Sequence, residues 1–120
     1  MALKDPVASQ HSRLRVAVVG GLSRGAEQWS RAGDAAGVEV EHHDGRTAGR
    51  GSEAIVAAVR RAQVVVIITE PNSHAGVAVA RRAAIAAARP HLLIKRLRPQ
   101  GLPELIANTL AATRGAPARS

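Results

Sequence analysis

The chain has 120 residues and no cysteine, and most of its 46% apolar content is Ala, Val, Leu and Ile. This length fits one domain with one core, and the absence of cysteine excludes disulfides, thiolate metal sites and thiol nucleophiles. With 17 Lys and Arg against 9 Asp and Glu, the net charge is +8, which favours an anionic partner but also fits a solvated, Arg-rich surface.

Several classes of protein are disfavoured by composition. No apolar run near the start reads as a signal peptide, and none approaches the ~20 residues of a membrane span. We therefore expect a cytoplasmic protein without a membrane partner. There is no Phe or Tyr and a single Trp, so stacking platforms for single-stranded nucleic acid are missing. Nucleic acid is kept as a secondary hypothesis.

The first predicted strand spans residues 14–19, a short apolar run ended by a glycine pair. Residues 1–13 before it are polar and are expected to be a flexible N-terminal arm. Ser23 is suited to cap a helix that runs to about Ala36. On that helix, Trp29 is expected to cover the sheet.

The next predicted strands differ in their patterning. Residues 38–42 alternate apolar and polar, which is typical of a strand at a sheet edge with one wet face. A basic, Gly-rich loop follows over residues 46–51, and Ser52 is predicted to cap a helix over residues 53–61. The run 64–68 is entirely apolar and β-branched, which indicates a central strand covered on both faces.

The last third of the chain repeats this alternation. An Ala-rich helix is predicted over residues 73–88 and a fourth strand over residues 91–94. A last helix begins near Pro103 and runs to about Ala112. Residues 113–120 are expected to be a flexible C-terminal tail.

Strict alternation of strands and helices with short links predicts parallel strands. An edge position for the second strand and a central one for the third give the order 2-1-3-4. The fold class is therefore α/β, a three-layer Rossmann-like or flavodoxin-like half with a four-stranded parallel sheet and helices on both faces. Residues 14–112 form this single domain. Ligands of such folds bind above the carboxyl ends of the strands, here between strands one and three.

The loop after the first strand, residues 20–25, reads Gly-Gly-Leu-Ser-Arg-Gly. Paired glycines let a backbone approach a ligand, and the helix that follows offers free N–H groups to an anion. The loop is neither a dinucleotide fingerprint nor a Walker loop. A phosphate cradle is one interpretation, and a tight strand-to-helix turn is the other.

The loop after the second strand, residues 42–45, reads His-His-Asp-Gly. Adjacent side chains of an extended chain point to opposite sides, so one histidine can face the crevice. A metal site would combine His43 with His74, and Asp44 or Glu70 would add an oxygen ligand of the kind that zinc or iron accepts. The alternative is a pair of surface histidines beside an Asx turn.

The loop after the third strand, residues 69–74, reads Thr-Glu-Pro-Asn-Ser-His. Ser73 or Asn72 can cap the following helix, and Glu70 can bind a ribose hydroxyl, orient His74 or act as a base. Neighbouring Ser and His do not make a catalytic triad. The alternative for His74 is an exposed residue of the capping turn.

These three turns together resemble the small bacterial family catalogued as domain of unknown function 2325. That family pairs a V-G-G turn with an H-D-G turn and an S-H turn, and the resemblance covers residues 14–110. It implies a Rossmann-like fold with a polar site but no established reaction. Members often carry a Cys before the S-H turn, where this chain has Pro71-Asn72. The residues that the resemblance places in the site are Gly20, Gly21, His43, Asp44, Ser73 and His74.

The leading hypothesis is a binding or regulatory module for an anionic small ligand at the carboxyl edge of the sheet. A metal-assisted enzyme that uses His43, His74 and Glu70 is one alternative, so catalysis is left open and no cofactor is identified. A structural protein, self-assembling as a homodimer or associated with nucleic acid, is the other. The predicted ligand-binding residues are Gly20, Gly21, Ser23, Arg24, His43, Asp44, Gly45, Glu70, Asn72, Ser73 and His74.

Overall fold

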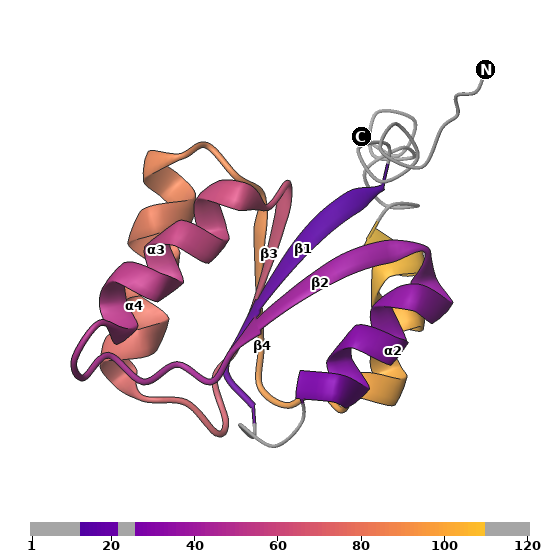
Figure 1. The fold of residues 1–120 in the computed structure, drawn as a ribbon, viewed down its shortest axis with the longest axis horizontal. Helices are drawn as coiled ribbons and strands as arrows, with labels where there is room; N and C mark the ends of the chain where they lie inside the picture. The colour runs from indigo at the N-terminus through magenta and orange to yellow at the C-terminus, as the bar shows by residue number, and fades with distance from the viewer. Residues whose placement is uncertain (1–12, 22–25, 110–120) are drawn as a thin grey trace.

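The computed structural model describes residues 13–21 and 26–109 (Figure 1). Its sheet has four parallel strands in the order β2-β1-β3-β4. This confirms the predicted α/β class, the strand order and the parallel direction. The strands are β1 (Leu14–Val19), β2 (Val38–His43), β3 (Val64–Ile68) and β4 (His91–Ile94).

The strand register brings the four carboxyl ends to one edge. Val19, the last residue of β1, pairs with His43 of β2 and Ile67 of β3. Ile68, the last residue of β3, pairs with Ile94 of β4. The loops after all four strands therefore leave the sheet from the same side.

Helices cover both faces of the sheet, as predicted (Figure 1). Helices α3 (Gly51–Arg61) and α4 (His74–Ala86) pack on one face. Helix α2 (Ala26–Ala36) lies on the other, beside a final helix over residues 102–109 that follows the 3₁₀ turn η2 (Pro99–Gly101). None of the described helices is long and apolar enough to span a bilayer.

Alternation along the central strands builds two cores. Ala17 and Val19 of β1 belong to the cluster under α3 and α4, while Val16 and Val18 belong to the cluster under α2. Because both faces of β1 and β3 are covered, their side chains are apolar on both sides, as expected for central parallel strands. The single indole, Trp29, is 2% exposed against the second cluster, so its predicted packing on the sheet is confirmed.

The predicted cap of α3 is wrong. The helix begins at Gly51, two residues before the predicted start at Glu53, so Ser52 lies inside it. The N-cap position is Arg50, whose side chain makes no capping bond. The chain enters the helix through a backbone turn instead, in which the N–H of Gly51 donates to the carbonyl of Ala48 at 2.9 Å.

Some predictions fall on residues that the structure does not describe. These are the arm up to residue 12, the loop 22–25 with Ser23 and Arg24, and residues 110–120 with the end of the last helix and the tail.

Candidate functional site

The three turns that the sequence singled out lie side by side at the carboxyl edge of the sheet. The N–H of Gly20 donates to the carbonyl of His43 at 2.7 Å, and the N–H of Gly21 donates to the carbonyl of Pro71 at 2.8 Å. The glycine pair after β1 is thus hydrogen-bonded to the turns after both neighbouring strands.

Asn72 lies at the centre of this contact. Its Nδ2 donates to the carbonyl of Ile68 at 2.7 Å and also lies 3.4 Å from the carbonyl of Val19. Its Oδ1 accepts from the N–H of Ser73 at 2.7 Å. One amide therefore satisfies backbone groups at the ends of both central strands and at the start of α4, groups that would be costly to leave unpaired.

Three glycines surround that amide because no side chain fits there. A Cβ on Gly45 would overlap Asn72 Oδ1, one on Gly76 would lie 2.6 Å from the same atom, and one on Gly20 would lie 2.8 Å from Asn72 Nδ2. Gly20 and Gly45 also have φ values of 110° and 95°, which L side chains rarely adopt. We call Asn72 with Gly20, Gly45 and Gly76 the asparagine junction.

Ser73 holds the start of α4 to this junction. Its hydroxyl oxygen accepts from the N–H of Gly76 at 2.8 Å, so Ser73 is the N-cap, one of the two candidates that the sequence offered with Asn72. The same hydroxyl donates to the carbonyl of Gly45 at 3.0 Å. Its proton is therefore engaged with the turn after β2.

His43 and Asp44 also bond within their own turn. His43 Nδ1 accepts from the N–H of Gly45 at 2.9 Å, an arrangement that requires a neutral ring with its proton on Nε2. Asp44 accepts from the N–H of Arg46 at 3.0 Å and pairs with its guanidinium at 3.0 Å. Burial would raise the pKa of Asp44, but the N–H and charge of Arg46 outweigh it and lower that pKa.

His42, which is not among the predicted site residues, makes a second set of contacts. Its ring stacks on Trp29 with centroids 5.5 Å apart, and its Nε2 donates to the carbonyl of Gly20 at 2.6 Å. Burial lowers the pKa of His42, more than the bond to Gly20 raises it. The alternation of β2 could have indicated this contact. His42 pairs with Val18, whose side chain belongs to the core under α2 together with Trp29.

A depression of about 340 Å³ lies beside the first turn of α4. His74 and Arg81 are exposed there, and Glu70 on its rim pairs with Arg96 at 3.2 Å. The residues that line it are Thr69, Glu70, Asn72, Ser73, His74, Val77, Ala78 and Arg81.

Most of the predicted site residues that the structure describes thus separate into two groups, while Asp44 pairs with Arg46 in its own turn. The junction and its hydrogen bonds gather Gly20, Gly21, His43, Gly45, Asn72 and Ser73. The depression gathers Glu70 and His74 with Asn72 and Ser73. Within the described residues, no three or more His, Cys, Asp or Glu side chains are grouped so as to hold a metal ion.

The fold and this edge define a small four-stranded parallel α/β domain whose loops are joined through one asparagine. The chain belongs to the family described as an uncharacterized protein conserved in bacteria, DUF2325, whose profile matches residues 15–108. The resemblance seen in the three turns is therefore confirmed. Comparison with curated proteins and with solved structures finds no significant match.

Proposed function

We propose that this protein is a binding module for a small anionic ligand, and that the ligand occupies the depression beside the first turn of α4. The observation that carries the proposal is the depression itself, because its volume of about 340 Å³ falls within the range of small-molecule sites, roughly 300–1,000 Å³.

The charge around the depression supports an anion. The first-turn N–H groups of a helix carry partial positive charge and lack intrahelical partners, and Ser73 caps only that of Gly76. Exposed His74 and Arg81 add donors at the rim. The carboxylate of Glu70 is the acidic group there, and Arg96 pairs with it.

The hydrogen bonds made by Ser73 and His43 favour a supporting role for these two side chains over a catalytic one. The hydroxyl of Ser73 and Nδ1 of His43 are both committed to the backbone of Gly45, and a nucleophile or base needs its reacting atom free in a cleft. These groups support the loops and leave recognition to the residues around them.

The test is a thermal-shift panel of inorganic phosphate, sulfate and nucleoside mono-, di- and triphosphates at matched ionic strength. A specific ligand at about 100 times its Kd adds about 2.7 kcal/mol to the free energy of unfolding. We expect His74→Ala and Arg81→Glu to reduce the shift, because both side chains line the depression.

Arg31→Glu is the matched control, since Arg31 is an exposed residue of α2 whose charge pairs with Glu27, and α2 packs on the other face of the sheet. We expect it to leave the shift in place. The proposal would be contradicted if no anion of the panel stabilised the protein. It would also be contradicted if the Arg31 variant lost as much of the thermal shift as the His74 and Arg81 variants.

A further inference from the structure

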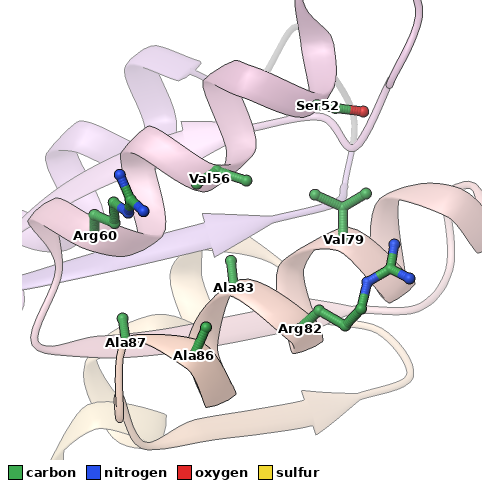
Figure 2. Close-up of a pocket in the computed structure, with 8 residues that line it drawn as sticks. All are labelled: Ser52, Val56, Arg60, Val79, Arg82, Ala83, Ala86 and Ala87. Carbon is green, nitrogen blue, oxygen red and sulfur yellow. The ribbon is translucent and has the colours of Figure 1, made fainter.

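A groove runs between α3 and α4, along the outer side of the helix pair that covers one face of the sheet (Figure 2). Its volume is about 520 Å³. Val56 comes from α3, and Val79 and Ala83, which form the floor of the groove, come from α4 (Figure 2). The residues that line it are Ser52, Val56, Arg60, Val79, Arg82, Ala83, Ala86 and Ala87.

The floor of the groove is apolar and firmly supported. Val79 and Ala83 pack against the buried cluster beneath α3 and α4, yet both remain partly exposed. Ala86 and Ala87 continue the α4 wall with small side chains. Small residues let another backbone approach closely, as at helix–helix contacts generally. The groove can therefore accept an apolar ridge without rearrangement of the core.

The rim of the groove is basic. Arg60 and Arg82 are exposed, and neither guanidinium forms an ion pair with a described residue. Neighbouring Arg61, in contrast, is paired with Glu41 of β2. The lining itself contains no acidic residue. A partner that fits both features carries apolar side chains flanked by carboxylates.

We propose that the α3–α4 groove docks an acidic amphipathic helix of another protein. The α3 residues that line the groove run from Ser52 to Arg60, about 12 Å of helix, which matches about two turns of a partner helix. Apolar residues spaced three or four apart would seat on Val56, Val79 and Ala83, in the helix-in-groove mode. Glu or Asp side chains beside them would pair with Arg60 and Arg82.

Charge argues against a second copy of this chain as the occupant. A two-fold contact through the groove would place Arg60 and Arg82 against the same residues of the partner, and the chain already carries a net charge of +8. The apolar floor argues against nucleic acid, which is held through phosphates and stacked bases. Neither objection applies to an acidic helix.

The experiment titrates the full chain into a labelled synthetic peptide of about 14 residues, with Leu on one helical face, Glu flanking it and Ala elsewhere. Anisotropy gives the affinity, and amide shifts locate the contact. We expect binding with shifts centred on Val56, Ala83 and Ala86. Combining Arg60→Glu with Arg82→Glu should weaken binding about tenfold or more.

Two controls separate the groove from charge alone. Arg31→Glu changes the net charge by the same step as Arg60→Glu or Arg82→Glu alone, but on the other side of the sheet, and should change affinity by less than about twofold, whereas each single groove variant should weaken binding more. A scrambled peptide with the same composition and no apolar face should bind far more weakly. Equal binding of the scrambled peptide, displacement by a DNA duplex at lower concentration than the peptide requires, or shifts outside the groove would overturn the proposal.

Substitution of the floor gives an independent check that does not alter charge. Ala83→Gln fills the groove and should reduce peptide affinity while the basic rim stays intact. Circular dichroism on each variant verifies that the fold is kept. Unchanged affinity in a folded Ala83 variant would also overturn the proposal.

Discussion

The asparagine junction and the α3–α4 groove differ in both their residue types and their roles. At the junction, polar side chains bond to backbone groups of neighbouring turns and glycines leave room for them. In the groove, alanines and valines face outward and two arginines have no ion-pair partner among the described residues. The motifs most visible in the sequence therefore organise the loops, while unpaired charge and exposed apolar surface lie elsewhere.

The largest effect that would test this contrast is expected from Gly45→Ala. The new Cβ would overlap Asn72 Oδ1, and the residue would be held at φ 95°. We expect the free energy of unfolding to fall by about 3–4 kcal/mol, measured by denaturant titration.

Gly49→Ala is the matched control for that substitution. Gly49 belongs to the same loop and also has positive φ, at 62°, but nothing lies within 4 Å of a Cβ placed there. The free energy of unfolding should fall by only about 1–2 kcal/mol in this variant, because it has the backbone strain of a positive φ without a steric overlap. Equal losses of stability in the two variants would show that the overlap with Asn72 adds nothing to the cost of Gly45→Ala.

The next largest effect is expected from Asn72→Ala. The substitution removes the partner of the carbonyl of Ile68, a fully buried residue, and an unsatisfied buried group costs about 1–3 kcal/mol. It also removes the exposed bond to the N–H of Ser73, which water can replace. Chemical denaturation should show a loss of this size, with faster amide exchange in the turns after β1 and β2. Exchange that changes only in α4 would mean that Asn72 acts as a local cap.

A smaller effect is expected from Ser73→Ala, which removes the cap of α4 and the bond to Gly45. We expect a loss of about 1–2 kcal/mol by denaturant titration. Ser52→Ala is its counterpart in the groove wall, where the serine makes no capping bond, and should change stability by less than about 0.5 kcal/mol. A similar loss at both serines would contradict the assigned roles.

The pH dependence of stability should report on His42. Because burial lowers the pKa of His42 below its usual 6.5, acid protonates this ring in the unfolded chain before it does so in the folded one. The free energy of unfolding should therefore fall as pH drops below about 6.5. His42→Phe keeps a ring beside Trp29 but cannot titrate, so its curve should be flatter in this window. Parallel curves would assign the pH dependence to other groups.

Much of the fold was predictable because the patterns that encode it are local. The β-branched run of β3 and the alternation in β2 fixed which strand is central and which is at the edge, and the order followed. The start of α3 was not predictable from Ser52, because a backbone turn through Gly51 takes the place of a side-chain cap.

The candidate site was predictable in its location but not in its chemistry. That the turns after β1, β2 and β3 meet follows from parallel strands. That the amide of Asn72 leaves no room for a side chain at Gly45, and that this amide and the carbonyl of Ile68 leave none at Gly20, does not follow, because these contacts join residues far apart in sequence. The role of His42 was not predictable either. The predicted site included its neighbour His43, whereas His42 stacks on Trp29 of a distant helix.

The stack of Trp29 on His42 gives the molecule an intrinsic optical reporter. Trp29 is the only tryptophan and the chain has no tyrosine, so ultraviolet emission comes from this one indole. Nε2 of His42 donates to the carbonyl of Gly20 in the turn after β1. A ligand or substitution that displaces that turn therefore alters the surroundings of the fluorophore, and occupancy can be followed in the unlabelled protein.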